Sequence, residues 1–242
     1  MSRGLALVSG LAVVAAFGAM ARARGDEARR VDAGEWCVTR GKLSAGSDGR
    51  ARIEEPKVRA VVPKTDGNDV EIRFDYDGPS VETARLGSGE LRRQIGLKLR
   101  AADGCNLVYV MWRIEPRAEL VVSIKRNPGK RTHRECGTAG YQNLKPSKGG
   151  AAAAMGAAMA MAPGSHHALH AVLSGRMLRV WADKALAWEG EVDADALEGP
   201  VGMRTDNVRV TVELLARRGG QGAAACGAGG ARGAAAEAAE ED

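Results

Sequence analysis

Hydrophobic and polar residues alternate with a period of two along much of the chain. In Val70–Tyr76 every second residue is apolar, and the residues between them are charged. Such alternation is typical of β-strands that bury one face. The same kind of pattern predicts further strands at Ile95–Leu99, Val108–Ile114, Leu120–Ile124, Leu169–Leu173, Met177–Trp181, Leu186–Val192, Val201–Arg204 and Val208–Leu214.

Turn-forming residues separate these runs. They are Asp66-Gly67-Asn68, Asp77-Gly78-Pro79, Asp103-Gly104, Asn127-Pro128-Gly129, Ser174-Gly175 and Glu198-Gly199-Pro200. Short strands divided by such turns favour a sandwich or a barrel over alternating βαβ units. No clear amphipathic helix interrupts them. The sequence therefore predicts one all-β domain over residues 35–216.

Three segments depart from this pattern. Residues 147–164 are dominated by Ala, Gly and Met, and we expect a low-complexity insertion in a loop, as a short helix or as disordered chain. Residues 24–34 are charged and predict a linker. Residues 217–242 are rich in Gly and Ala and end in acids, so they predict a disordered tail that cannot bury enough surface to order itself.

The first 23 residues predict a cleavable signal peptide. Arg3 precedes an uncharged apolar run, Leu5–Met20, and Ala21-Arg22-Ala23 offers a small-x-small cleavage site. The run is shorter than the roughly 20 residues of a spanning helix. We therefore expect a secreted, periplasmic or otherwise extracytoplasmic protein with no transmembrane segment after cleavage. An uncleaved N-terminal anchor is the alternative.

Charge and composition narrow the possible partners. The 242 residues carry a net charge of +5, and loss of the leader removes two arginines and no acid. Acidic and basic residues are interleaved, as in Glu71-Ile72-Arg73, rather than gathered in a basic stripe, so no nucleic-acid partner is predicted. Aromatic residues make up only 4% of the chain. We expect the tryptophans in the core or at its edge: Trp36, Trp112, Trp181 and Trp188.

The four cysteines lack the C-x-x-C spacing of structural zinc sites. Export permits disulfides. Cys105 and Cys136 flank neighbouring strands and are predicted to form a bridge. Cys37 is then expected to be a buried thiol, and Cys226 lies in the tail.

The last part of the strand region carries a resemblance to a known family. His167–Leu173 and Ser174–Trp181 read as two strands across a tight turn, and Gly199–Thr205 has the pattern G-x-V-G-x-x-T ahead of a final strand. This order resembles the concanavalin A-like lectin/glucanase superfamily, especially its laminin-G-like and 3-keto-disaccharide-hydrolase-type members. The resemblance implies a two-sheet antiparallel β-sandwich of the jelly-roll type with one concave face where sugars often bind, and calcium in some relatives.

The polar positions of the alternating strands supply a candidate site. A sugar site needs planar donors and acceptors beside an aromatic ring. We predict that one sheet face binds a glycan or another cell-envelope ligand through Arg73, Asp75, Lys98, Tyr109, Arg113 and Lys125. The alternative is a wet face of cross-strand charge pairs, each contributing under about 1 kcal/mol.

Catalysis is not the primary prediction. Laminarinase-type relatives carry E-x-D-x-E on one strand, and Glu191–Asp195 matches only its first two acids. The main prediction is a non-catalytic binding module. One alternative is a glycoside hydrolase of the 3-keto-disaccharide type that uses Asp75 or Glu71, and another is a structural or interaction domain without a small ligand.

Metal binding receives little support. The histidines do not assemble three or four convergent zinc ligands from sequence spacing. Calcium is the one metal left open, because Asp66, Asn68 and Asp69 form an oxygen-rich segment. Turn chemistry explains the same residues. No cofactor is predicted.

Overall fold

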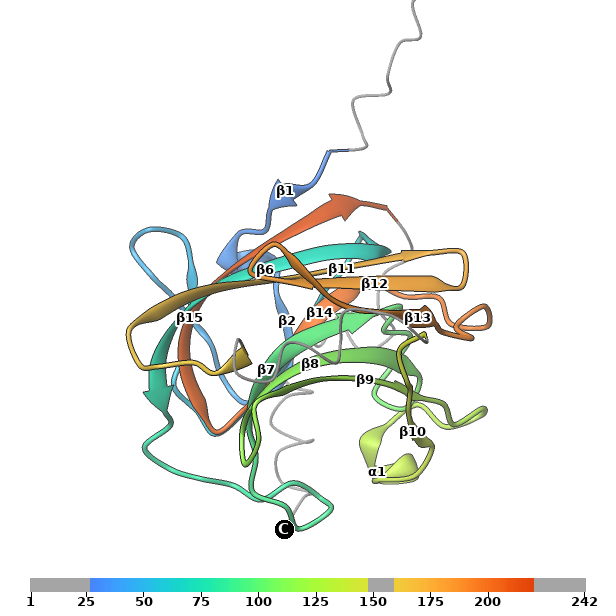
Figure 1. Ribbon diagram of the computed structural model, residues 1–242, viewed down its shortest axis with the longest axis horizontal. Helices are drawn as coiled ribbons and strands as arrows, with labels where there is room; N and C mark the ends of the chain where they lie inside the picture. The colour runs from blue at the N-terminus through green and yellow to red at the C-terminus, as the bar shows by residue number, and fades with distance from the viewer. Residues whose placement is uncertain (1–26, 148–158, 220–242) are drawn as a thin grey trace, which may run out of the picture.

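The computed structural model describes residues 27–147 and 159–219, and it is built almost wholly from antiparallel β-strands in two facing sheets (Figure 1). The predicted all-β, two-sheet antiparallel sandwich is therefore confirmed. The proposed leader, Cys226 and nearly all of the predicted tail lie outside the described residues. Among the described residues, no helix has the length and apolar character needed to cross a bilayer.

The eight-stranded sheet runs in the order β13-β12-β11-β6-β15-β4-β3, with β1 paired to β15. Its strands are β1 (Arg29–Arg30), β3 (Ser44–Ala45), β4 (Ala51–Ile53), β6 (Thr65–Pro79), β11 (Ser165–Ser174), β12 (Met177–Ala182), β13 (Ala185–Glu191) and β15 (Val208–Arg218).

The seven-stranded sheet runs in the order β10-β9-β8-β7-β14-β5-β2. Its strands are β2 (Cys37–Arg40), β5 (Lys57–Val62), β7 (Arg93–Leu99), β8 (Leu107–Glu115), β9 (Glu119–Lys125), β10 (Tyr141–Asn143) and β14 (Val201–Asp206). Two short helices complete the described structure, the 3-10 helix η1 (Ala33–Glu35) and α1 (His133–Cys136).

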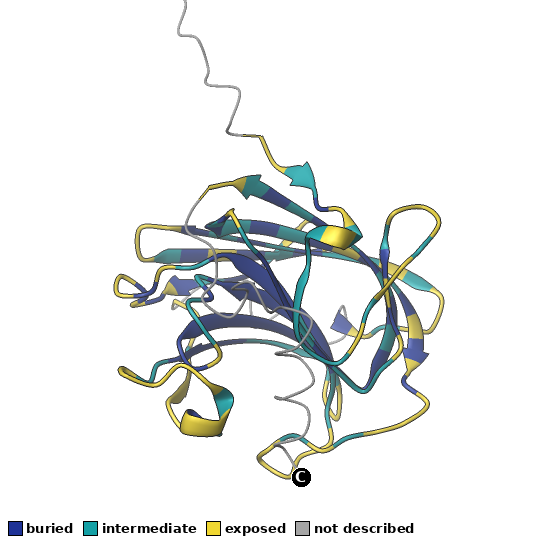
Figure 2. Ribbon diagram, turned by 180° about the vertical axis from the view of Figure 1, so that it is seen from behind, coloured by how far each residue is buried: buried dark blue, intermediate teal, exposed yellow. Residues whose placement is uncertain are grey.

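The core fills the space between the two sheets. Ile72 and Phe74 of β6 pack from one side, and Val110 and Trp112 of β8 pack from the other. Figure 2 shows exposed residues mainly on loops and turns, and buried residues along the strands. Eight of the nine strands expected from alternation lie within observed strands, and the ninth, Leu186–Val192, extends one residue beyond β13. Alternation finds them because a period of two identifies the residues that a strand turns away from water.

Two of the expected turns are instead part of β6. The chain reverses earlier, at Pro63 and Lys64, and Lys64 has a positive φ of 61°. Gly67 then lies so close to the carbonyl of Gly199 that a Cβ would be 2.2 Å from that oxygen. Near the other end of β6 the register with β15 shifts, which leaves a bulge beside Gly78. In both places glycine serves a strand rather than a turn.

The ordered domain extends slightly beyond the predicted range of 35–216. At the start, Arg29 and Arg30 pair with β15, and Arg29 also forms an ion pair of 2.5 Å with Glu35. At the end, β15 continues to Arg218. Part of the expected linker thus adds a strand to the sheet.

The described end of the Ala/Met-rich insertion contributes to the core. Met159 is buried, and its carbonyl accepts a hydrogen bond of 2.9 Å from Nε1 of Trp112. Residues 148–158 of the insertion lie outside the described residues. Trp112 and Trp188 are buried and Trp36 packs at the core edge, as expected. Trp181 does not lie in the core as expected. Its neighbours Val180 and Ala182 in β12 point inward, so Trp181 points outward, where its ring stacks on His170.

The predicted bridge between Cys105 and Cys136 is confirmed, with an S–S distance of 2.07 Å. It ties the start of β8 to α1. Cys37 was expected to be a buried thiol, but it is also disulfide-bonded, so that prediction is wrong. The sequence around Cys37 could not reveal this bond, because a disulfide depends on which cysteine the fold brings within reach and not on the neighbouring residues.

Replacing Cys105 and Cys136 together by serine is expected to lower the free energy of unfolding by about 3 kcal/mol, because the bridge closes a loop with a sequence separation of 31 in the unfolded chain. Urea denaturation followed by tryptophan fluorescence measures the change. A loss below about 1 kcal/mol would show that the bridge does little to constrain the unfolded chain.

Candidate functional site

The outer face of the seven-stranded sheet carries a pocket of about 340 Å³. Tyr109, Met111 and Arg113 of β8 line it, whereas their neighbours Val110 and Trp112 face the core. In Figure 1 this sheet arches, and α1 lies below it, on the side away from the eight-stranded sheet. We call this cavity the outer pocket. The size suits a small ligand.

Two tyrosines form an aromatic pair in the outer pocket. The rings of Tyr109 and Tyr141 stack with centroids 5.9 Å apart and planes 23° apart. Tyr109 is buried, but Tyr141, on the edge strand β10, is 40% exposed. The guanidinium of Arg204 lies 5.3 Å from the Tyr109 ring. Burial, and secondarily the neighbouring Tyr141, raise the pKa of Tyr109, so its hydroxyl stays protonated.

A buried carboxylate holds two arginines beside these rings. Asp206 is fully buried at the end of β14. Its oxygens accept hydrogen bonds from Arg59 at 2.5 Å, Arg204 at 2.8 Å and Gln94 at 2.6 Å. Burial acts to raise the pKa of Asp206, but the two guanidinium groups outweigh it and hold the pKa well below its usual range. The carboxylate is ionised and fixes both arginines.

The loop between β6 and β7, residues 80–92, forms one wall of the outer pocket. Leu86, Gly87, Ser88, Glu90 and Arg92 line the cavity from this loop. Buried Asn207, in the turn after β14, holds the loop in place. Its side-chain amide donates to the carbonyls of Ala84 and Arg92, and its Oδ1 accepts from the Ala84 N–H at 2.7 Å.

The outer pocket is strongly cationic. Among the residues that the structure describes, Glu90 is its only acidic lining residue, and it forms an ion pair with Arg92. Seven lining residues are basic: Arg40, Lys57, Arg59, Arg92, Lys98, Arg113 and Arg204. The mixed charge of the sequence as a whole conceals this concentration.

Three of the six predicted site residues meet in the outer pocket: Lys98, Tyr109 and Arg113. Arg113 also forms an ion pair with Glu119. Lys125 does not line the cavity, although its Nζ lies 5.0 Å from the centroid of the Tyr141 ring. It is fully buried, and its Nζ donates to the carbonyls of Gly104 and Gly137, which adjoin the two cysteines of the confirmed bridge. Burial, then Arg204, lowers the pKa of Lys125 to about 8.

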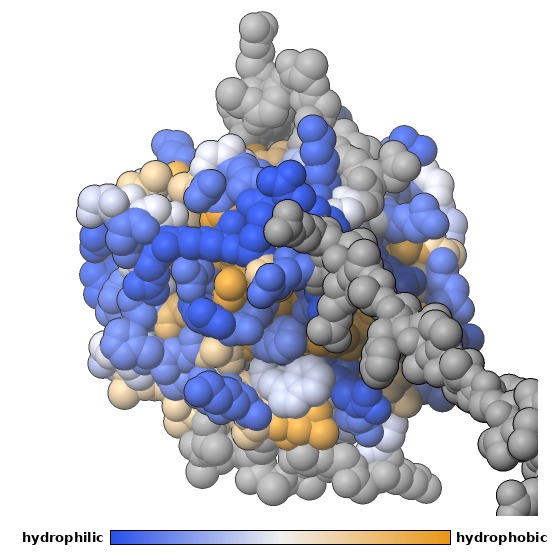
Figure 3. Space-filling view, turned by 90° about the horizontal axis from the view of Figure 1, so that it is seen from above, coloured by the Kyte–Doolittle hydropathy of each residue, from blue (hydrophilic) through white to orange (hydrophobic). Residues whose placement is uncertain are grey.

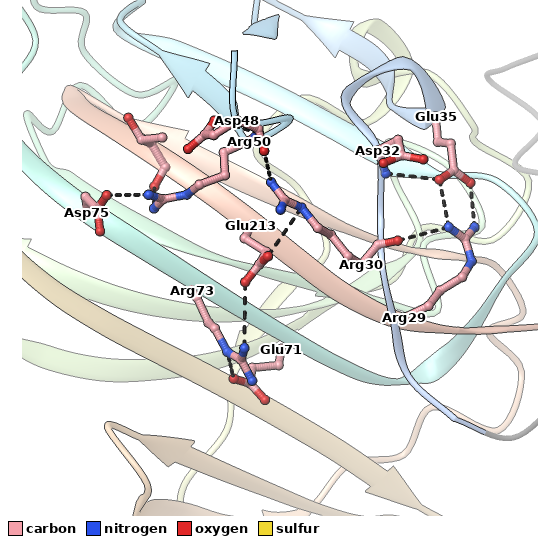
Figure 4. Close-up of polar contacts among 11 residues, drawn as sticks. Arg29, Arg30, Asp32, Glu35, Asp48, Arg50, Glu71, Arg73, Asp75 and Glu213 are labelled. Carbon is pink, nitrogen blue, oxygen red and sulfur yellow. Dashed lines mark hydrogen bonds and ion pairs between the residues drawn. The ribbon is translucent and has the colours of Figure 1, made fainter. Parts of the chain in front are cut away.

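Arg73 and Asp75 do not join this site, so the prediction of one shared face is wrong for them. Both lie on β6, in the other sheet, and Figure 4 shows them within an ion-pair network on that sheet. Asp75 accepts from Arg50 at 2.6 Å, and Arg73 contacts Glu71 at 2.6 Å. Figure 3 shows that mainly hydrophilic side chains cover this side of the molecule. Alternation identified outward residues but not their sheet.

Sequence reasoning missed several residues of the outer pocket. Arg59 and Arg204 stand opposite each other in the register of β5 and β14, although they are far apart in the chain. Lys57 alternates with buried Val58 in β5, so alternation in this unassigned strand could have found it. Tyr141 lies in a strand of three residues, too short to give a pattern.

The residues considered for metal binding have other partners. Asp69, from the oxygen-rich segment, contacts His170 at 2.9 Å and Arg217 at 3.1 Å, and Asp66 accepts from Asn68 at 2.7 Å. Within residues 27–147 and 159–219 no three His, Cys, Asp or Glu side chains gather as a metal would require. In the outer pocket, burial and then Lys125 lower the pKa of His133 to about 4, so its imidazole is neutral at pH 7.

Comparison with known proteins leaves the family open. No family model and no curated protein matches the sequence. Carbohydrate binding module CBM66 from Bacillus subtilis is 11% identical, with a TM-score of 0.48 over 74% of this chain and 91% of that chain. Domain 4 of AbnA, a GH43 extracellular arabinanase from Geobacillus stearothermophilus in complex with arabinotriose, is 10% identical, with a TM-score of 0.46 over 81% and 95%.

A third solved structure is the galectin LEC-6 from Caenorhabditis elegans. It is 8% identical, with a TM-score of 0.38 over 71% of this chain and 99% of that chain. Likenesses this distant assign neither a family nor a ligand to this chain. The functional argument therefore depends on the outer pocket itself.

Proposed function

We propose that this protein is an exported, non-catalytic module that binds a carbohydrate or another glycan-bearing component of the cell envelope in the outer pocket. The observation that carries the proposal is the exposed ring of Tyr141, which is stacked on Tyr109 at the wall of a cavity rich in polar groups. The sequence resemblance to the concanavalin A-like superfamily points to the same class of ligand.

The lining of the outer pocket suits a sugar. An aromatic ring such as Tyr141 can cover the apolar face of a pyranose, while hydrogen-bonding groups fix its hydroxyls. Thr39, Ser88, Ser123, Thr138 and Asn143 supply hydroxyl and amide groups around the cavity. Since both an aromatic surface and polar groups line one cavity, recognition of a polyhydroxylated ring is the favoured interpretation.

Export is supported by the Cys105–Cys136 bridge, because structural disulfides persist mainly in oxidising compartments. The N-terminal pattern of the sequence agrees with this proposal.

The arrangement of acids favours binding over hydrolysis. Most glycosidases use two carboxyl groups about 5–9.5 Å apart across the scissile bond. Of the described residues lining the outer pocket, only Glu90 is acidic, and Arg92 neutralises it. The acids of the hydrolase hypothesis, Glu71 and Asp75, lie on β6 and are paired with Arg73 and Arg50. Paired charges of this kind are what a structural surface would carry.

A glycan array compared between the wild type and Tyr141→Ala tests the proposal. We expect wild-type binding to at least one glycan class and a loss of about tenfold in affinity for Tyr141→Ala, because the stacking surface is removed. Trp181→Ala is the matched control, since Trp181 also stacks on a ring but lies on the eight-stranded sheet. Its affinity should stay within about twofold of the wild type.

Two results would count against this function. An array without any bound glycan would overturn it, and equal binding by Tyr141→Ala would remove the outer pocket as the site. A parallel screen for glycosidase activity addresses catalysis, and turnover abolished by substitutions in the outer pocket would overturn the non-catalytic assignment.

A further inference from the structure

Three arginines stand side by side across adjacent strands in the outer pocket. Arg40 of β2 is in register with Arg59 of β5, and Arg59 is in register with Arg204 of β14. We call these three residues the arginine row. Like charges directly opposite each other on neighbouring strands are destabilising. A row of this kind therefore needs anionic groups to offset it.

Asp206 offsets only part of the charge of Arg59 and Arg204. Its one carboxylate is shared by Arg59 and Arg204, so the three groups together remain cationic. Lys57 lies opposite Asp206 in the strand register, and it makes no ion pair with any residue that the structure describes. Burial is the main cause that lowers the pKa of Lys57; the charges of Arg40 and Arg59 act in the same direction, and Asp206 acts against them.

We propose that the ligand of the outer pocket is an anionic glycan, in which a carboxylate or sulfate group on the sugar binds at Lys57 and the arginine row. This inference rests on the proposed function and specifies its ligand. Guanidinium groups bind such oxyanions with paired, charge-assisted hydrogen bonds. Tyr141 and the neutral polar lining then contact the sugar ring, which distinguishes this site from a site for a bare anion.

The anion and the aromatic ring have separate contacts within one cavity. Arg204 links the two, because its guanidinium lies over Tyr109 at 5.3 Å and its Nη1 donates to the Tyr141 hydroxyl at 3.5 Å. An acidic sugar can thus place its charge against β5 and β14 while its ring lies toward β10. A neutral sugar would use only the second set of contacts.

Titration calorimetry of the full chain with matched pairs of oligosaccharides tests the inference. The pairs are oligogalacturonate against its methyl ester, and a sulfated galactan oligomer against its desulfated counterpart. We expect the charged member of at least one pair to bind about tenfold more tightly than its neutral partner, the effect of one charge-assisted hydrogen bond. Which pair shows the difference distinguishes carboxylate from sulfate.

Variants of Lys57 connect the charge preference to the outer pocket. Lys57→Gln should remove most of the difference between charged and neutral members, and Lys57→Arg should keep it. Lys184→Gln is the matched control, because Lys184 is exposed in the turn between β12 and β13 on the other sheet. Thermal unfolding of each variant confirms that it is folded.

The possible outcomes separate this inference from the proposed function. Equal binding of charged and neutral members, unchanged in Lys57→Gln, would overturn the anionic preference and leave glycan binding intact. If none of these four oligosaccharides binds while the array shows a bound neutral glycan, the anionic preference fails and glycan binding stands; if the array also shows no bound glycan, both ideas fail. Binding of a single-stranded oligonucleotide or of inorganic phosphate in place of every glycan would also overturn both, and would assign the arginine row to another polyanion or to a bare ion.

Discussion

Asp206→Ala is expected to lower the free energy of unfolding by about 3–5 kcal/mol, because it leaves two largely buried guanidinium groups without their carboxylate. Arg59 and Arg204 are only 14% and 13% exposed in their side chains, so water cannot fully replace the lost partner. The amide of Gln94 also loses its acceptor. Urea denaturation followed by tryptophan fluorescence measures the loss.

Asp195→Ala is a suitable control for this prediction. The Asp195 side chain is 61% exposed and lies 3.9 Å from Arg176, so its removal should change stability by less than about 1 kcal/mol. If Asp206→Ala cost no more than Asp195→Ala, the buried carboxylate would not be what holds the arginines together.

Trp112→Ala is the second substitution with a large expected effect, a loss of about 3–5 kcal/mol in the free energy of unfolding. Trp112 is fully buried and meets Phe74 edge to face, with ring centroids 6.1 Å apart. The truncation leaves a cavity between the sheets and removes the donor to the Met159 carbonyl. The change is measured by chemical denaturation followed by far-ultraviolet circular dichroism, because the substitution removes one of the four tryptophans and so alters the fluorescence signal itself.

Trp112→Phe separates packing from hydrogen bonding. It keeps most of the aromatic volume and removes the indole N–H, so we expect a smaller loss of about 1–2 kcal/mol. An alanine variant no less stable than the phenylalanine variant would be inconsistent with a close-packed core at this position.

The strands of the core were predictable because their signal is local. Val70–Tyr76 buries alternate residues against the core. In Val108–Ile114 alternation again separates the two sides: Val110 and Trp112 pack in the core, whereas Tyr109 and Met111 pack in a second buried cluster on the outer side. The same rule placed Tyr109 and Arg113 outside the core. It failed at the ends of β6, where Gly67 and Gly78 resemble turn residues but serve close packing and a bulge.

The candidate site was only partly predictable because it depends on which strands become neighbours. Arg59 and Asp206 are 147 residues apart in the chain and 2.5 Å apart in the structure. No period along the sequence contains that information. For the same reason Asp75 was grouped with Tyr109, since outward positions in β6 and β8 look alike although they belong to different sheets.

Asn207 holds the loop of residues 80–92 in place without hydrogen bonds to the side chains by which this loop lines the outer pocket. Asn207 binds the loop only through backbone groups, at Ala84 and Arg92, so the side chains between these two points are not needed to anchor it. Related chains could therefore exchange the segment from 85 to 91 and acquire a different selectivity while they keep the same scaffold. A library designed to change what the outer pocket accepts would therefore vary residues 85–91 and keep Asn207.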